Sequence, residues 1–347
     1  MNTIFRTIFS VLLCQVLLSQ PCNAQVTSTE GETIRILGVG NSWTRDSMRW
    51  LSAIAKSAGK EIIVGHAYLG GSNLWEQYRG IDDKTFTYLH FGKEQVVHNT
   101  YQYWKYEGTE DPVKTPSDEE GYNNGFAGIG VTLESVVTDE PWDIIVFQPH
   151  VLLRYHMPQY IGFDMNDLVA RIKSMMKPEV AEKVVCGIMI PFSYPKGNTH
   201  CPQHVIDVYN EGITPADQHG LDELYENMHR CIQEDAIRLV DHLGDNCSFT
   251  INVGQAIYNA RQNPELSKFG YRFQRAINNT HLAEGLPKYV ASLCFAYTLL
   301  GIQPDEISFY PKTSPTVSQT GEKSTAKVSE SEVYQARLEA WKVCNQE

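Results

Sequence analysis

The sequence predicts an α/β fold in which a parallel β-sheet carries helices on both faces. Short apolar runs, rich in β-branched residues, alternate along the chain with longer segments whose apolar residues recur at helical spacing. Most of these runs end at glycine or at a polar turn, as buried strands do in doubly wound sheets. The apolar content of 42% and the charged content of 20% are those of a globular domain.

Five strands and five helices carry this pattern. We expect strands at residues 33–39, 61–68, 142–147, 183–190 and 247–253. We expect helices at residues 45–58, 131–137, 165–176, 221–243 and 286–300. The prediction is a three-layer α/β/α sandwich around a central parallel five-stranded sheet. Such folds bind ligands at the carboxyl ends of the strands.

Two segments interrupt the alternation of strands and helices. The first lies within the main domain, residues 25–311, and the second follows it. Residues 75–128 include alternating aromatics and predict a β-rich insertion or a long loop over the sheet edge. Residues 312–332 are rich in Ser, Thr and Lys, which predicts a flexible linker. A short helix at residues 332–343 completes the C-terminal segment 312–347.

The N-terminal residues 1–24 have the pattern of a secretory signal peptide. Arg6 precedes an apolar stretch at residues 8–18, and the small-residue signal Cys22-Asn-Ala24 follows. The apolar stretch is too short to span a membrane. We therefore expect the chain to be exported to the periplasm or the exterior, without a membrane span.

The charge of the chain argues against some partners. Without Arg6 of the leader, 28 basic residues face 41 acidic ones, which gives a net charge of −13. Proteins that bind nucleic acid or anionic membranes carry the opposite sign, so we expect a small molecule or a glycan instead. After the leader, six cysteines permit disulfides, but their scattered spacing does not demand them.

The turn after the first strand, "GVGNSW" at residues 38–43, allows three interpretations. It begins a dinucleotide-binding pattern, but Trp43 stands where the third glycine belongs, and the acidic residue expected at the end of the next strand is missing. Asn41 and Ser42 also suit a plain helix N-cap. In the third interpretation Ser42 is a nucleophile, because a serine at a strand-to-helix turn is exposed beside backbone N–H groups.

Four blocks in order support the third interpretation. "VGNSW" resembles the first block of the SGNH (GDSL-like) hydrolases, with Asn41 in place of the usual Asp. "YLGGSNLW", "WDIIVFQPH" and "NNTHLAEGLPKYVASL" resemble the second, third and last blocks, over roughly residues 33–302. The detailed pattern is similar to the DUF4886 type, an uncharacterised branch found in secreted Bacteroidetes proteins.

The resemblance implies a flavodoxin-like SGNH fold and a set of roles. Ser42 would be the nucleophile, His281 the general base, and Asn278 the residue that orients His281. Asn278 stands where the family has Asp, so it can hold the imidazole but supplies no charge. The oxyanion hole would consist of the backbone N–H groups of Ser42 and Gly71. Its third donor would be the side chain of Gln148, with His150 as the alternative.

Other candidates have simpler explanations. The cluster "HCPQH" at residues 200–204 resembles a metal site, but no second cluster completes a zinc coordination sphere, so we expect neither a metal nor another cofactor. Ser72 is explained equally well as a cap. Trp43, Trp75 and His200 are candidates for contact with substrate, although core packing is the more common role of such rings.

These observations predict a secreted serine esterase that removes O-acyl groups, acetyl above all, from carbohydrates. The alternative is a carbohydrate-binding protein on the same fold, in which Asn41, Asn278 and the altered third block reflect weakened or lost catalysis.

Overall fold

The computed structural model describes residues 32–82, 85–90, 93–98, 102–107, 132–151, 153, 162–199, 201–210, 217–270, 272–275, 279–317 and 322–345. The predicted signal peptide lies outside these residues.

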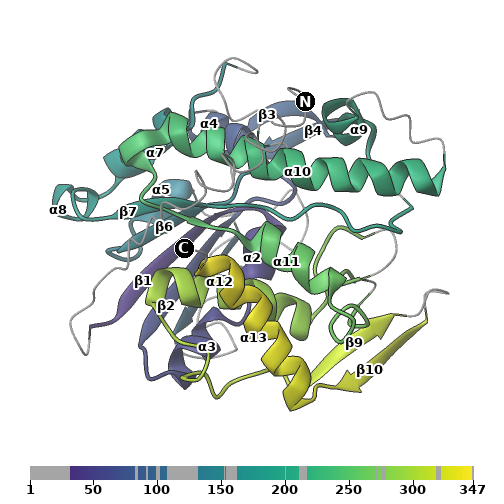
Figure 1. Ribbon diagram of the computed structural model, residues 1–347. Coiled ribbons are helices and arrows are strands. Elements are labelled where there is room, and N and C mark those ends of the chain that lie inside the picture. Colours follow the sequence, from purple (N-terminus) through teal and green to yellow (C-terminus); the bar gives the residue numbers. More distant parts are fainter. Residues whose placement is uncertain are drawn as a thin grey trace, which may run out of the picture.

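Five parallel strands and one antiparallel strand form the central sheet, in the order β5-β2-β1-β6-β7-β8 (Figure 1). The parallel strands are β1 (Ile34–Gly40), β2 (Ile62–Tyr68), β6 (Ile144–Phe147), β7 (Val185–Met189) and β8 (Phe249–Ile251). In β1, Ile36 lies opposite Val64 of β2 and Ile144 of β6. The chain order therefore reverses at β1, and doubly wound folds bind ligands beside the carboxyl end of a strand in this position.

The predicted number of strands is wrong by one. β5 (Gln102–Glu107) adds a sixth strand, antiparallel to β2 at the edge of the sheet. Its alternating aromatic residues give the reason, since Tyr103 and Tyr106 are both buried, each in a different apolar cluster. β5 belongs to the predicted β-rich insertion, which also contains a hairpin of β3 (Thr85–His90) and β4 (Lys93–His98).

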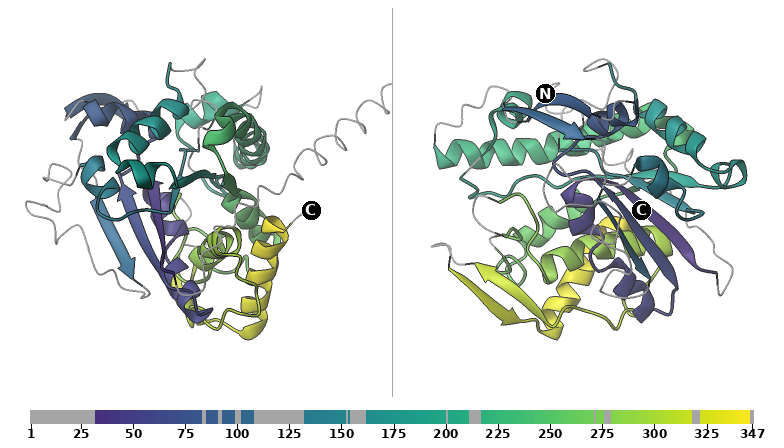
Figure 2. Two further views of the ribbon diagram at one scale, coloured as in Figure 1. Left: turned by 90° about the vertical axis from the view of Figure 1, so that its left-hand side faces the viewer. Right: turned by 180° about the vertical axis from the view of Figure 1, so that it is seen from behind.

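Helices cover both faces of the sheet (Figures 1 and 2). One apolar cluster contains residues of α2 (Ser42–Ser47), α3 (Leu51–Ser57), α9 (Gln203–Tyr209), α11 (Val253–Gln262), α12 (Leu286–Leu300) and α13 (Glu330–Cys344). The other contains residues of α4 (Leu74–Asp82), α5 (Leu133–Val137), α7 (Met165–Met175) and α8 (Pro178–Ala181). The long helix α10 (Gln218–Leu243) contributes to both, and the short turn η3 (Gly244–Asn246) follows it. The helix predicted at residues 45–58 is two helices, α2 and α3.

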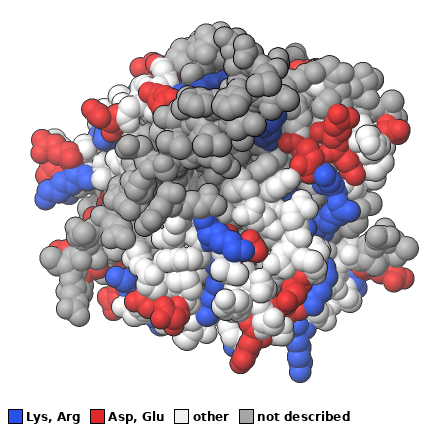
Figure 3. Space-filling model, in the orientation of Figure 1, with Lys and Arg blue, Asp and Glu red and all other residues white. Residues whose placement is uncertain are grey.

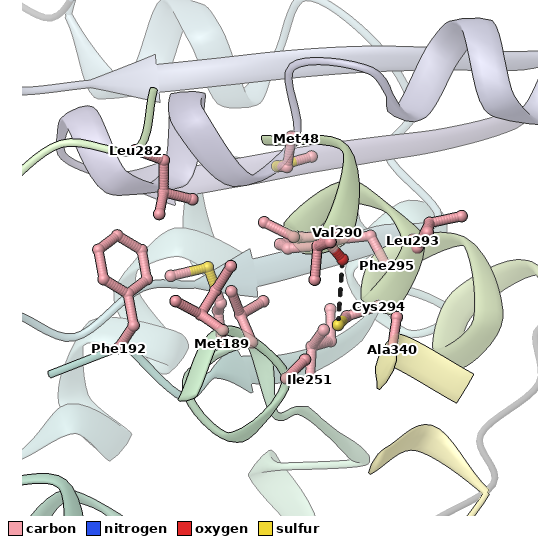
Figure 4. Packing of buried hydrophobic residues seen from close by; sticks show 14 of the residues in the cluster. Met48, Met189, Phe192, Ile251, Leu282, Val290, Leu293, Cys294, Phe295 and Ala340 are labelled. Atoms are coloured by element: carbon pink, nitrogen blue, oxygen red, sulfur yellow. Dashed lines mark hydrogen bonds between the residues drawn. The ribbon is translucent and has the colours of Figure 1, made fainter. Parts of the chain in front are cut away.

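Helix α12 is the centre of the first cluster. Every residue of α12 except Thr298 is buried, as expected for a helix that is apolar around its whole circumference. Figure 4 shows Val290, Leu293 and Phe295 of this helix packed among side chains from other elements. Because α12 is surrounded, its few polar residues, including Lys288, sit in the interior with defined partners.

The segment that we predicted to be a flexible linker contains two strands. β9 (Thr313–Val317) and β10 (Lys323–Lys327) pair as an antiparallel hairpin. Ser314 is fully buried, and its hydroxyl accepts a hydrogen bond from the Leu286 N–H at the start of α12. α13 then begins with a capping box between Ser329 and Glu332 and packs on α11 and α12.

The surface carries mixed charge. Figure 3 shows Asp and Glu side chains interspersed with Lys and Arg on one face of the molecule. Among the described residues, no helix has both the length and the apolar content that crossing a membrane requires.

Candidate active site

The turn between β1 and α2 is rigidly built. Asn41 caps α2, because its side-chain oxygen accepts a hydrogen bond from the Trp43 N–H at 2.9 Å. Gly40 is required for close packing, since a Cβ there would lie 2.0 Å from Oγ1 of Thr44. Ser42 is the first residue of the helix and is 9% exposed. The sequence thus fixes Ser42 at the carboxyl end of the central strand.

Gln148, the predicted third oxyanion donor, lies beneath this turn. Its side chain is fully buried, and its Oε1 accepts hydrogen bonds from the Asn41 N–H and the Thr44 hydroxyl, both at 3.1 Å. A backbone N–H can only donate, so this contact fixes which way the amide points. Its Nε2 donates to the carbonyl of Pro149. The oxygen of the Gln148 amide therefore holds the turn in place, while its nitrogen is bound to the neighbouring backbone.

The glycine turn after β2 lies beside the turn that holds Ser42. The Leu69 N–H donates to the Gly40 carbonyl at 3.0 Å, and Nδ2 of Asn41 donates to the Ser72 carbonyl at 2.9 Å. Gly71, between them, has a φ of +67°, which favours glycine. Within the described part of the chain, the N–H groups of Ser42 and Gly71 meet no hydrogen-bond acceptor. Two unused backbone donors thus sit on two turns that are tied together.

His281 reaches this region from a distant part of the chain. The segment after residue 279 pairs with the one before residue 276, with hydrogen bonds from the Arg275 N–H to the His281 carbonyl and from the Ala283 N–H to the Phe273 carbonyl. The His281 side chain is 29% exposed, and its Nδ1 lies 3.1 Å from Oδ2 of Asp46. His281 is therefore docked on α2, the helix that begins with Ser42.

Asp46 was not among the residues that we predicted for the site. Its side chain is fully buried and is surrounded by donors: besides His281, these are Lys288 at 2.9 Å, Arg275 at 3.1 Å and the Leu282 N–H at 3.2 Å. Burial opposes ionisation of Asp46, but the hydrogen bond from His281 and the charges of Lys288 and Arg275 outweigh it and lower the pKa of Asp46 below 3.8. Asp46 is thus a carboxylate at neutral pH.

One signal for Asp46 exists in the sequence. It follows Ser42 by four residues, so the two lie on one face of α2, one turn apart. The sequence does not show that His281 docks on this face, because that contact depends on residues 235 positions away.

The candidate substrate contacts, the alternative oxyanion donor His150 and the serine Ser72 lie in different surroundings. Trp43 is 5% exposed and stacks on Phe192 with ring centroids 4.4 Å apart, so it is part of the core. His150 lies parallel to Trp43, with ring centroids 6.3 Å apart. Trp75 is partly buried on α4 under the guanidinium of Arg79. Buried Ser72 donates its hydroxyl to the Leu69 carbonyl, which fits a structural role.

Asn278 and His200 lie outside the described residues. Across the residues that are described, no group of three or more His, Cys, Asp or Glu side chains is arranged to hold a metal ion.

Comparisons with known proteins establish the fold. No protein-family model matches the chain, and no curated protein sequence matches it. The chain resembles the crystal structure of a DUF4886 family protein from Bacteroides uniformis, with a TM-score of 0.64, 18% identity, and coverage of 89% of this chain and 93% of that one. A gut microbial diltiazem-metabolizing enzyme matches with a TM-score of 0.32 and 11% identity, over 84% of this chain and 55% of that one.

Proposed function

We propose that the chain is a serine ester hydrolase of the SGNH type, in the DUF4886 branch, with Ser42 as nucleophile and His281 as general base. One observation carries the proposal: Nδ1 of His281 is hydrogen-bonded to buried Asp46, one helical turn after Ser42 on the same helix. The similarity of fold to a DUF4886 protein and the four sequence blocks support the assignment.

In this proposal Asp46 has the role that the resemblance gave to Asn278. A carboxylate that accepts the Nδ1–H of an imidazole fixes its tautomer and leaves Nε2 to take a proton. It also stabilises the imidazolium that forms, which an Asn side chain does not. Since i and i+4 positions on a helix lie about 6 Å apart, an imidazole bound to Asp46 can extend along α2 toward Ser42.

The reaction would proceed by acyl transfer. Ser42 Oγ attacks the ester carbonyl while Nε2 of His281 takes its proton and then delivers it to the leaving alcohol. The N–H groups of Ser42 and Gly71 are the donors that we propose for the oxyanion. Gln148 and Asn41 act indirectly, since they hold the two turns that carry these donors. Water then attacks the acyl-enzyme by the same proton route.

We propose O-acyl groups on carbohydrates, acetyl above all, as the substrate class. This choice rests on the resemblance to SGNH esterases and on the predicted signal peptide. The chemistry requires no metal or organic cofactor.

Hydrolysis of a small aryl acetate tests the proposal. We expect the Ser42→Ala and His281→Ala variants to lose about 10³-fold or more in kcat/KM, because each removes a group that acts in the transition state. Ser72→Ala is the matched control, since it removes a nearby buried serine hydroxyl that we do not place in the reaction. Activity that persists in Ser42→Ala would rule out Ser42 as the nucleophile.

The alternative is a carbohydrate-binding protein without esterase activity. It predicts that the wild-type protein does not hydrolyse aryl acetates or acetylated sugars but binds glycans, with an affinity that Ser42→Ala leaves unchanged. The pairing of His281 with the buried carboxylate of Asp46 favours the proposal of an enzyme, because a binding surface does not need a base oriented by a carboxylate.

A further inference from the structure

The C-terminal helix α13 packs against α12 and runs in the same direction, since later residues of α13 meet later residues of α12. Trp341 of α13 meets Tyr297 of α12 edge to face, with ring centroids 5.1 Å apart. Nearer the start of α13, Nε of Arg337 donates to the hydroxyl of Tyr289 at 3.1 Å. These contacts set the register of the two helices and bring the last residue of α13, Cys344, to the middle of α12.

Cys344 lies over two residues of α12 that are one turn apart, Cys294 and Thr298. Its thiol donates to the Cys294 carbonyl at 3.8 Å and is close to the side chain of Thr298. Cys294 is fully buried, and its thiol is directed to the Val290 carbonyl at 3.5 Å (Figure 4). The two cysteines are therefore in contact across the two helices.

The two thiols differ in reactivity. The interaction with the Cys294 side chain lowers the pKa of Cys344, whereas the same interaction and burial raise the pKa of Cys294. Cys344 is also the more exposed residue of the two. Because the thiolate is the nucleophile in disulfide exchange, Cys344 is the residue that reacts first.

We propose that Cys294 and Cys344 form an oxidation site that closes to a disulfide between α12 and α13. The Cys344 thiolate attacks the disulfide of an oxidant, either oxidised glutathione or a thiol–disulfide oxidoreductase, and releases one thiol of that oxidant. The Cys294 thiolate then displaces the second oxidant thiol from the mixed disulfide. Two electrons pass to the oxidant, and the two cysteine protons leave with its thiols.

The bond would close a loop of roughly 50 residues, which contains the end of α12, the hairpin β9–β10 and the whole of α13. Constraining a loop of this length lowers the entropy of the unfolded chain, so oxidation should raise Tm by several degrees. The predicted signal peptide would direct the protein to a compartment in which such bonds persist. The inference does not depend on esterase activity.

Thiol alkylation tests the proposal directly. The purified, reduced protein is incubated with oxidised glutathione, then denatured and alkylated with iodoacetamide. Mass spectrometry measures the mass of the product. We expect two fewer alkyl groups than in the untreated protein, and a non-reducing peptide map in which the Cys294 peptide is linked to the Cys344 peptide. We also expect Tm to rise by roughly 5 °C or more.

Two variants make the test specific. Cys344→Ser should abolish the linked peptide and the rise in Tm, whereas Cys201→Ser, a change at another partly exposed cysteine, should keep both. Full alkylation of Cys294 and Cys344 after oxidation would overturn the proposal. So would glutathione that stays on Cys344 without closure to Cys294. The wild-type result decides the question even if a variant folds poorly.

Discussion

At the scale of single residues, the candidate site depends on the buried carboxylate of Asp46. It faces one imidazole, two cationic side chains and one backbone N–H, so its charge is balanced within the interior. Buried charges that are paired and hydrogen-bonded in this way are costly to disturb, because removing one member leaves the others uncompensated. Asp46 therefore links stability to the proposed chemistry.

Asp46→Asn should impair both properties. The amide keeps the shape of the side chain but removes the charge that holds the His281 tautomer, so we expect kcat for an aryl acetate to fall about 10²–10⁴-fold with little change in KM. Buried Lys288 loses a counter-charge, so the free energy of unfolding should fall by about 3 kcal/mol. Steady-state kinetics and urea denaturation measure the two effects. Asp167→Asn, at an exposed position of α7, should change neither. Wild-type kcat in Asp46→Asn would refute the orienting role.

The raised pKa of Glu76 predicts that the stability of the folded protein depends on pH. It is 5% exposed, and burial raises its pKa from 4.5 to about 7 despite the hydrogen bond from the Asn73 N–H. Between these values the folded state holds a proton that the unfolded state has lost, so stability falls as pH rises from 4.5 to about 7. The difference in pKa corresponds to about 3 kcal/mol.

Glu76→Gln removes this titration while keeping an oxygen for the Asn73 N–H. Urea denaturation at pH 5 and pH 8 should show that the wild-type protein loses more stability over this interval than Glu76→Gln does. Glu134→Gln, an exposed position near the start of α5, should behave like the wild type. Equal pH slopes for the wild type and Glu76→Gln would contradict the raised pKa.

At the scale of elements, two turns at the carboxyl ends of β1 and β2 act as one unit. Asn41 joins them, since its oxygen caps α2 and its nitrogen donates to the carbonyl of Ser72. This explains why Asn suits the position where the SGNH pattern has Asp, because a carboxylate can cap the helix but cannot donate to a carbonyl.

Asn41→Asp should therefore weaken the protein, although it introduces the residue that the SGNH pattern has at this position. It would place a carboxylate oxygen against the Ser72 carbonyl at a site that is 3% exposed. We expect a loss of about 2 kcal/mol in the free energy of unfolding and a fall of at least 10-fold in aryl acetate kcat. Asn41→Ser keeps a cap without the repulsion and should lose less stability. A fully stable and active Asn41→Asp protein would show that the hydrogen bond from Asn41 to the Ser72 carbonyl is dispensable.

The helices and strands differ in how well the sequence predicts them. The alternation of apolar strands and helices predicted the parallel strands, because burial on both faces leaves a strong pattern. The hairpin of β9 and β10 left none, since its residues are mostly polar and it is held by the buried hydroxyl of Ser314 and by backbone contacts with Phe269 and Gly270. For Asp46, helical spacing showed only that it shares a face with Ser42. Its contact with His281 depends on how α12 and the segment before it dock, which local pattern does not encode.

At the scale of the whole molecule, α13 closes the apolar cluster that surrounds α12. Ala336 and Ala340 are fully buried, and they face the layer formed by α11 and α12. α12 carries Lys288, which pairs with Asp46. By packing against α12, the terminal helix therefore stabilises the candidate site, although none of its described residues belongs to that site.

A charge placed beneath α13 tests this support. Ala336→Asp should destabilise the protein by at least 3 kcal/mol, because it buries an unpaired carboxylate. Tyr334→Asp, two residues earlier on the same helix and 62% exposed, should leave the free energy of unfolding within about 0.5 kcal/mol. Thermal and urea denaturation of both variants provide the comparison. Similar losses in the two variants would mean that α13 is not packed as described.

Ser42 and Asp46 belong to one six-residue helix, so two members of the proposed triad are positioned as soon as that helix forms on β1. His281 arrives separately, with a segment that follows more than 200 residues later. Recovery of the proposed esterase activity during refolding would therefore depend on one event, the docking of the His281 segment onto α2. It should lag behind the spectroscopic signal of sheet formation.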